Sequence, residues 1–295
     1  MSSNIANPES FSISIAIPSS FIDVYSSTAE KTQQVGRIAR AVAIFQAEKI
    51  LVYLDRKNRT QMKNQRLITY ILEYMETPQY LRKYLFGKLP ELRYAGLLPP
   101  LRTPHHPLAK KAKSLKPGEV REGVAFEDND TMVVDVGVET PLPLLNFQAT
   151  RRPKRLTVKI LREKPNQLFA SPCPPPSPQT YWGYKVMRID TTLGDYLTTT
   201  DKHDFVIATS RRGTPLNEQI DIIRNQWQKN KEMLLLFGSH KEGLSEILRR
   251  EGHKISGVSN HMINLLKYQG TASIRTEEAV FIGLAAFRLL EQIER

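Results

Sequence analysis

The sequence predicts an α/β protein built on a parallel sheet, with a small all-β module inserted into it. Two observations predict this class. Strand-like and helix-like segments alternate near both ends of the chain, and a basic, proline-rich middle part with short strand-like runs separates them. At 295 residues the chain has room for a large core and for such an insertion.

The amino-terminal part reads as strand, helix, strand and helix. FSISIAI (11–17) alternates large apolar with small residues, which is typical of a strand. Ser27 and Glu30 have the spacing of a capping box, and apolar residues then recur at helical spacing. KILVYL (49–54) is a second strand, so the pair is expected to be parallel with a right-handed crossover. RLITYILEYM (66–75) continues as a helix.

The middle part changes in character from about residue 97. VREGVAF (120–126), TMVVDVGV (131–138) and RLTVKIL (155–161) are short strand-like runs with turns between them, which favours a small barrel or sandwich. The proline-rich stretch 171–178 is expected to be an extended linker without regular structure. We therefore expect an inserted domain over residues 97–182.

The carboxyl-terminal part returns to strand–helix alternation. The expected elements are a strand at 204–209, a helix opened by Thr214 and Pro215 and running to about Lys229, a strand at 232–238, a helix to Arg250, a strand within 257–266 and a last helix from Thr276. The main domain is thus discontinuous and consists of residues 10–96 and 183–295.

Charge favours a polyanionic partner. The chain has 42 Lys and Arg against 30 Asp and Glu, a net charge of +12, and neutralising phosphates releases condensed counterions. Fifteen Lys and Arg against nine Asp and Glu lie in 101–190, with RRPKR (151–155) as the densest cluster. The alternative is that the excess of positive charge serves solubility and not a polyanionic partner.

Several classes are excluded. No apolar run has the length of a membrane span, and the first residues lack the pattern of a signal peptide. The single cysteine, Cys173, excludes an internal disulfide framework and a multi-cysteine zinc site. We expect a cytoplasmic protein without membrane contact.

Three strand exits carry the candidate chemistry: VIATSRRGTPL (206–216), LLLFGSHKEGLSEIL (234–248) and INLLKYQGTASIRTEEA (263–279). Each combines a glycine and a hydroxyl residue with an apolar run, and ligands bind where loops leave the carboxyl ends of parallel strands. Gly238 and Gly243 would let a ligand approach the backbone, or they serve only a tight turn. Without GxxxxGK[ST] or GxGxxG, a P-loop or Rossmann site has no support.

These three motifs in this order resemble the SPOUT class of RNA methyltransferases. The sequence is most similar to the archaeal and eukaryotic branch of RNA uridine-N3 methyltransferases, which carries an inserted OB-like β-barrel. QGTASIRTEEA (269–279) is the most specific match, and YAGLLPPLRTPHHPL (94–108) resembles the same branch. Lys267 departs from the proline that the pattern NxxPxQG has at this position.

The resemblance implies a trefoil-knotted sheet, a homodimer, an RNA substrate gripped by the basic insertion, and S-adenosylmethionine bound by the three loops. The residues that map onto the cofactor cradle are Thr209, Ser210, Gly238, Ser239, Gly243, Asn264, Leu265, Leu266, Gln269, Gly270, Thr271, Thr276 and Glu278. The resemblance points to Arg212, Arg102 and Arg37 as candidate catalytic residues, and it implies no metal. Its reaction would be methylation of a uridine base at N3 in ribosomal RNA.

Some roles stay open at this point. Ser239 and Glu242 also have capping-box spacing, and Glu277 and Glu278 suit the first turn of a helix as well as a cofactor. Arg275 could be a structural clamp, and His105 and His106 are either surface histidines or RNA contacts. The rival functions are a non-catalytic RNA-binding or ribosome-assembly protein that keeps the fold, and a methyltransferase for another RNA base or a ribose.

Overall fold

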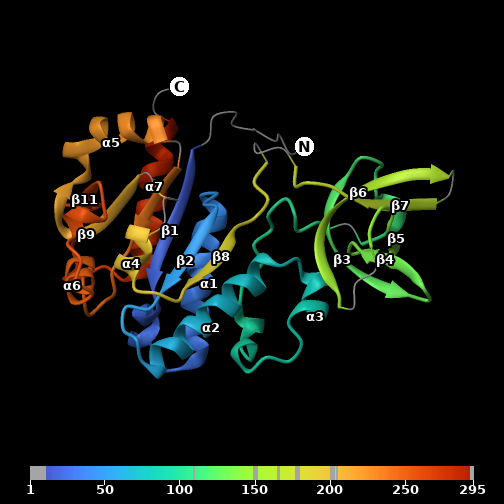
Figure 1. The fold of residues 1–295 in the computed structure, drawn as a ribbon, viewed down its shortest axis with the longest axis horizontal. Helices are drawn as coiled ribbons and strands as arrows, with labels where there is room; N and C mark the ends of the chain where they lie inside the picture. The colour runs from blue at the N-terminus through green and yellow to red at the C-terminus, as the bar shows by residue number, and fades with distance from the viewer. Residues whose placement is uncertain are drawn as a thin grey trace. The chain divides into compact units, whose positions relative to one another are not determined.

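The computed structural model in Figure 1 describes residues 11–292 apart from 109, 149–151, 165–166, 177–179, 200–202, 204 and 231. The described residues belong to two compact units. The sheet unit lies within Glu9–Met75, Pro90–Pro99 and Tyr184–Arg295, and the barrel unit lies within Glu76–Leu89 and Pro100–Gly183. Residue 151 of the basic cluster, residues 177–178 of the expected linker and residue 204 of an expected strand lie outside the described residues.

The sheet unit contains six described strands in one sheet, ordered β11-β9-β10-β1-β2-β8. Every neighbouring pair is parallel, as the sequence predicts. The strands are β1 (Ser12–Pro18), β2 (Lys49–Tyr53), β8 (Lys185–Ile189), β9 (Val206–Pro215), β10 (Glu232–Leu236) and β11 (His261–Asn264).

Helices connect these strands (Figure 1). They are α1 (Thr28–Ile44), α2 (Arg59–Glu76), α4 (Leu193–Thr199), α5 (Leu216–Asn230), α6 (Leu244–Arg250) and α7 (Thr276–Gln292), with short 3-10 turns η1 (Ser19–Val24), η3 (Pro90–Leu92), η4 (Ala95–Leu97) and η6 (Ile255–Gly257). Helix α1 packs against α7, where Arg288 Nε donates to the Phe45 carbonyl at 2.7 Å.

The core of the sheet unit lies around β1, the strand between β10 and β2. Ile13, Ile15, Ala16 and Ile17 are fully buried, so both faces of this strand are covered. Such burial is expected for an inner strand of a parallel sheet with helices on its faces. The small residues Ser14 and Ala16 are therefore shielded from solvent together with the isoleucines, while Ser12 at the start of the strand is half-buried.

The predicted helix starts are confirmed at two places. The Ser27 side chain accepts from the Glu30 backbone N–H and Glu30 accepts from the Ser27 N–H, which is the capping box expected for α1. Helix α7 begins at Thr276 as predicted. Helix α2 begins at Arg59, seven residues before the predicted start, because its first two turns are polar and lack an apolar periodicity.

Strand β8 was missed in the sequence. It carries Lys185 and Arg188 in five residues, which weakens the strand pattern. Its place at the edge of the sheet explains the charges, because edge strands commonly carry charged residues that discourage further pairing.

The barrel unit holds five described strands in the order β5-β4-β3-β6-β7, all antiparallel neighbours. They are β3 (Val120–Asp128), β4 (Thr131–Asp135), β5 (Leu142–Pro143), β6 (Lys154–Lys164) and β7 (Gln167–Pro172), accompanied by α3 (Arg82–Leu85), η2 (Gln79–Leu81) and η5 (Ala112–Ser114). Leu144 forms an isolated bridge to Ala170, and the Leu145 N–H donates to the Ala170 carbonyl at 2.8 Å. The sheet is therefore nearly closed into a barrel.

The expected linker 171–178 was wrong at its start. Ser171 and Pro172 belong to β7, where they lie opposite Lys159 and Val158 of β6. A proline is tolerated at the end of a strand because no further ladder hydrogen bond is required of it. No helix in the part of the chain that the structure describes is long and apolar enough to span a membrane.

Candidate functional site

The three predicted loops leave three adjacent strands. Strands β11, β9 and β10 are neighbours in the sheet and run parallel. Their carboxyl ends therefore meet at one edge, which is where ligands of parallel sheets bind. The first loop is 209–213, the second is 237–243 and the third is 265–275.

The first loop is an interruption within β9. Ala208 pairs with Met262 of β11, but the next pair is Thr214 with Ile263, so residues 209–213 loop out of the ladder. A Cβ at Gly213 would lie 2.5 Å from the Ile263 carbonyl carbon, a backbone atom. Only glycine allows the chain to pass Ile263 so closely.

The third loop lies against the first. Asn264 Nδ2 donates to the Arg211 carbonyl at 3.0 Å, and the Arg211 guanidinium donates to the Ala272 carbonyl. The Asn264 side chain also accepts from the Leu266 N–H at 3.0 Å. Hydrogen bonds from side chains to the backbone therefore hold the first and third loops together, and the Asn264 side chain stabilises their contact.

The second loop is held by both neighbours. Thr209 Oγ1 donates to the Leu236 carbonyl at 2.8 Å, and Thr276 Oγ1 donates to the Gly238 carbonyl at 3.1 Å. A Cβ at Gly283 of α7 would lie 3.3 Å from both Phe237 and Leu265. The three exits thus converge, as the sequence predicts.

The two glycines of the second loop face each other. A Cβ at Gly238 would lie 3.2 Å from the Gly243 Cα and 3.1 Å from the Leu244 nitrogen, so the turn itself requires a small residue there. At Gly243 a Cβ would meet only the Glu246 carboxylate, at 2.7 Å, and a flexible side chain can move. The fold therefore explains Gly238 and leaves Gly243 less constrained.

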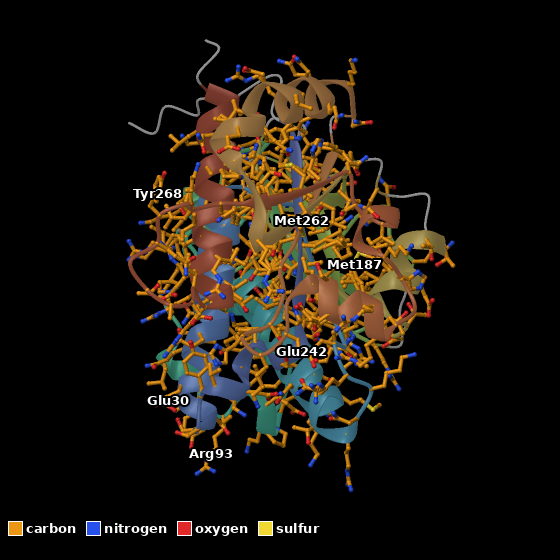
Figure 2. The ribbon with its side chains drawn as sticks, turned by 90° about the vertical axis from the view of Figure 1, so that its left-hand side faces the viewer. Glu30, Arg93, Met187, Glu242, Met262 and Tyr268 are labelled. Carbon is orange, nitrogen blue, oxygen red and sulfur yellow. The ribbon has the colours of Figure 1, made fainter. Side chains whose placement is uncertain are left out.

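Ser239 is not the cap of α6. The helix begins at Leu244 with Gly243 as its N-cap, while Ser239 Oγ accepts from the Glu242 N–H at 3.1 Å within the turn before it. The capping-box prediction was wrong because Glu242 turns its carboxylate toward Arg56 and Arg250 and not back onto Ser239. Glu242 is labelled in Figure 2.

The third loop exposes its most specific residues. Gln269 Nε2 donates to the Thr271 carbonyl at 2.8 Å and Thr271 Oγ1 donates to the Ser273 carbonyl at 3.1 Å, which gives the loop a compact internal turn. Leu266 is 41% exposed and Tyr268 is 85% exposed; Tyr268 lies at the margin of the view in Figure 2.

Gly270 is not required by the fold. A Cβ placed there would meet no atom within 4 Å, and the residue lies outside the left-handed region that favours glycine. Open space in front of a glycine, at the edge where three loops converge, fits a ligand that approaches the main chain. The loops are thus suited to hold a small molecule through backbone groups.

The three candidate catalytic arginines differ in setting. Arg212 is in the first loop, with an 80% exposed side chain and its Nη1 3.3 Å from Glu246 Oε1, and its backbone N–H donates to Ser210 Oγ at 3.2 Å. Arg37 is exposed on α1. Arg102 belongs to the barrel unit, where it is exposed with a φ of 56°. Of these, only Arg212 lies on one of the three loops.

Glu278 caps α7. Its carboxylate accepts from the Arg275 N–H at 2.9 Å, the role that a carboxylate in a first helical turn commonly has.

Glu277 is 2% exposed and accepts a hydrogen bond from the Tyr25 hydroxyl. Tyr25 was missed in the sequence, because it lies 250 residues from its partner Arg275 and in no motif.

The histidine prediction was wrong for His105. This side chain is fully buried, and its Nε2 lies 3.1 Å from Glu76 Oε1, so it is neither a surface residue nor an RNA contact. Glu76 also pairs with Arg155 at 2.6 Å. Burial alone would raise the pKa of Glu76, but the hydrogen bonds from His105 and Arg155 lower it to about 2. Burial lowers the pKa of His106 to about 4.

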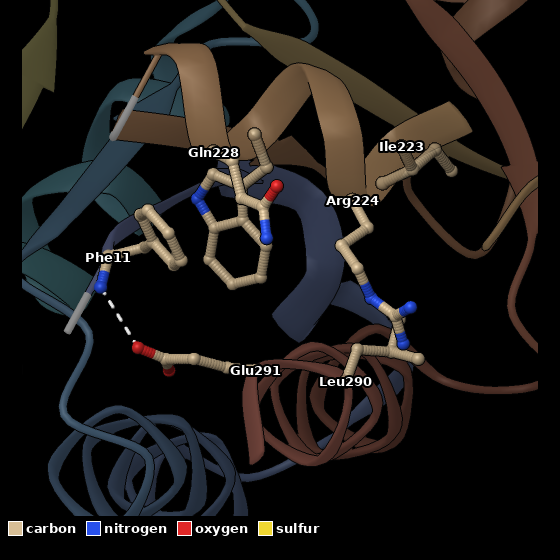
Figure 3. A pocket seen from close by; sticks show the side chains of 7 residues that line it. Phe11, Ile223, Arg224, Gln228, Leu290 and Glu291 are labelled. Atoms are coloured by element: carbon tan, nitrogen blue, oxygen red, sulfur yellow. Dashed lines mark hydrogen bonds between the residues drawn. The ribbon is translucent and has the colours of Figure 1, made fainter. Parts of the chain in front are cut away.

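A small cavity lies elsewhere in the sheet unit. Phe11, Trp227, Leu290 and Glu291 are among the residues that line it, and the Phe11 N–H donates to Glu291 (Figure 3). Phe11 directly precedes β1, so this cavity is at the amino edge of the sheet, away from the three loops. Among the described residues, no group of three or more His, Cys, Asp or Glu side chains is arranged to hold a metal ion.

Comparison with known proteins defines the class. The chain matches the family described as "Putative RNA methyltransferase" over residues 12–287. The match covers nearly the whole chain, from β1 to α7. The protein therefore belongs to this family and is a methyltransferase.

Individual relatives carry more specific names. A "28S rRNA (uridine-N(3))-methyltransferase" of Drosophila melanogaster is 30% identical over 95% of this chain, and the match spans 62% of that relative's length. The human protein of the same name is 29% identical over 94% of this chain and 78% of its own length. An uncharacterized protein of Halobacterium salinarum is 29% identical over 94% of this chain and 99% of its own length.

Proposed function

We propose that this protein methylates N3 of a uridine in ribosomal RNA and takes the methyl group from S-adenosylmethionine. The observation that carries the proposal is Gly270: a glycine without a structural reason lies in the most specific motif, where three loops converge. The names of the fruit-fly and human relatives supply the substrate and the target atom. The cytoplasmic location expected from the sequence stays a prediction.

The cofactor would be held mainly by main-chain groups. Gly238, Gly243, Leu265, Gln269 and Gly270 supply backbone at the convergence of the loops, and the residues of the cradle that are named from the resemblance complete it. When bound, S-adenosylmethionine would supply a methyl group activated by its sulfonium. Because the loops would hold the cofactor in a fixed position, we expect the orientation of its methyl group toward the accepting atom to supply much of the rate acceleration.

The substrate imposes two requirements on the protein. Uridine N3 carries a proton that must leave before N3 can accept a methyl group, and Watson–Crick pairing hides this atom, so the base must be presented unpaired. Arg212 or Arg102 would stabilise the negative charge that develops on the base. The basic residues of the barrel unit would grip the RNA backbone.

We assign the sheet unit to the SPOUT class with a trefoil knot. The close passage of Gly213 against Ile263 and the break in the β9–β11 register support a threaded chain. A homodimer is part of the proposal. Ile44 on α1 is 49% exposed and Leu289 on α7 is 59% exposed, and apolar side chains on two packed helices favour a second copy as their cover.

Two measurements test the proposal. Calorimetry with S-adenosylmethionine is expected to give a heat of binding, and nucleoside mass spectrometry of ribosomal RNA incubated with protein and cofactor is expected to detect 3-methyluridine. If the protein bound S-adenosylmethionine but neither methylated ribosomal RNA nor consumed the cofactor, the assembly-protein alternative would be favoured. Methylation of another base or of a ribose would keep the enzyme class and reject the uridine assignment.

A further inference from the structure

A cluster of three side chains joins the segment after β1 to the start of α7. Arg275 Nη1 donates to the Tyr25 hydroxyl oxygen at 3.1 Å, and the guanidinium carbon lies 5.2 Å from the centroid of the Tyr25 ring. The Tyr25 hydroxyl donates in turn to Glu277 Oε1. The arginine is thus held twice by one tyrosine, through its ring and through its hydroxyl.

Burial increases along this cluster. Arg275 is exposed, Tyr25 is 9% exposed and Glu277 is 2% exposed. Burial, and then the hydrogen bond to Glu277, raise the pKa of Tyr25 to about 12, so the hydroxyl keeps its proton and stays a donor. The second oxygen of Glu277 is buried without a hydrogen-bond partner among the described residues. A half-satisfied buried carboxylate costs stability, so this arrangement is better explained by positioning than by folding.

The neighbouring cations of the loops have other partners. Arg211 donates to the Ala272 carbonyl, Arg212 lies 3.3 Å from Glu246, and Lys267 Nζ lies 3.0 Å from Glu218. Arg275 differs, because Glu278 accepts from its backbone N–H and not from its guanidinium. In the described part of the chain, Tyr25 is the hydrogen-bond partner of the Arg275 side chain, which leaves Nε and Nη2 for a ligand.

We propose that Arg275 binds a backbone phosphate of the RNA beside the loops for the methyl donor, and that Tyr25 and Glu277 are positioning residues that fix its guanidinium. This inference rests on the proposed function only in taking RNA as the substrate. An arginine presents planar, paired N–H donors that match phosphate oxygens, and phosphate contacts set the register of the chain without reading its sequence.

A phosphate fits this position better than the reacting base. Arg275 is exposed, and it shares the edge of the sheet with further exposed basic residues of the first and third loops, Arg211, Arg212 and Lys267. A spread of cations over a surface suits an extended polyanion. The barrel unit then would not be the sole RNA contact, because the sheet unit would hold the strand close to the transferred methyl group.

The test compares four variants of the full chain with the wild type. They are Arg275→Gln, Arg275→Lys, Tyr25→Phe and, as a matched control for loss of one exposed charge, Arg249→Gln at the end of α6. The binding of a fluorescein-labelled single-stranded oligouridine RNA is measured by anisotropy over a range of salt concentrations. Each variant is also titrated with S-adenosylmethionine by calorimetry, and its melting temperature is recorded.

Arg275→Gln is expected to weaken RNA binding about tenfold at low salt and to reduce the slope of log K against log salt by about 0.7 to 1, the contribution of one phosphate contact. Arg275→Lys and Tyr25→Phe keep the charge, so they retain the slope but lose roughly threefold in affinity, because the guanidinium is absent or no longer fixed. Affinity for S-adenosylmethionine and the Arg249→Gln control stay at the wild-type level.

The proposal is overturned if Arg275→Gln keeps the wild-type salt slope, or if it lowers cofactor affinity and melting temperature together with RNA binding, as a clamp would. A wild-type salt slope of RNA binding together with a shifted pH–rate profile of methylation would also reject the proposal, because Arg275 would then stabilise the ionised base. The RNA measurement needs no turnover. A wild type that fails to bind the cofactor would therefore reject the proposed function while leaving this result readable.

Discussion

Replacement of Gly270 by leucine separates a ligand-binding glycine from a structural one. No atom lies within 4 Å of the position that a Cβ would take, and the backbone there is outside the left-handed region. We therefore expect the free energy of unfolding to change by no more than about 0.5 kcal/mol, the usual range for an exposed site. In the cofactor complex the side chain would displace one main-chain contact, a loss of about 2 kcal/mol or roughly 30-fold in affinity.

Calorimetry with S-adenosylmethionine and urea denaturation are the two assays for this variant. Gly257→Leu is the matched control. Gly257 is also exposed and also has no atom within 4 Å of a Cβ, but it precedes the amino end of β11, whereas the three loops follow the carboxyl ends of the strands. The control is expected to bind the cofactor like the wild type. If Gly270→Leu retained full affinity, the third loop would not touch the cofactor, and the proposed cradle would be rejected.

Three further changes probe the framework. Gly213→Ala places a Cβ 2.5 Å from the Ile263 backbone and is expected to lower the free energy of unfolding by about 3 kcal/mol in urea denaturation; an unchanged midpoint would contradict the close passage. Glu76→Gln removes a buried carboxylate from Arg155 and is expected to cost about 3 kcal/mol at neutral pH. Since the pKa of Glu76 falls from 4.5 to about 2 on folding, its stabilisation is present above pH 4.5 and disappears toward pH 2, so circular dichroism should show a flatter acid dependence for the variant than for the wild type. Ser27→Ala removes the cap of α1 and is expected to cost about 1 kcal/mol in a thermal melt, while Ser27→Asp, which can still cap, should restore it.

The main sheet could be predicted because its elements are marked by local physics. The apolar run of β10, the capping box at Ser27 and the apolar face of α7 each follow from neighbouring residues. Edge strand β8 was missed because its charged residues carry no apolar periodicity. The neighbouring prolines likewise concealed Ser171 and Pro172, the last two residues of β7, which lie opposite Lys159 and Val158 of β6.

The candidate site was predictable only in its loops. The motifs locate Gly238 and Gly270 because glycines and hydroxyl residues cluster at strand ends, but a sequence does not show which glycine the fold itself requires. That distinction needs the distances, which assign Gly213 to a backbone crossing and leave Gly270 unexplained by packing. Long-range partners such as Tyr25 and Arg275 carry no local signal, since their meeting depends on the completed sheet.

The strand order of the sheet unit also governs how the nascent chain can fold. Strand β1 lies between β2, which follows it closely, and β10, which begins only at residue 232. At ribosomal elongation rates, roughly 10 to 40 seconds separate the emergence of β2 from that of β10. Strand β1, whose three isoleucines are fully buried in the folded protein, remains without its neighbour β10 during this interval. Strands β3 to β7, which are contiguous in the chain, can already pair. Chaperones that shield isolated apolar strands would be needed most during this wait.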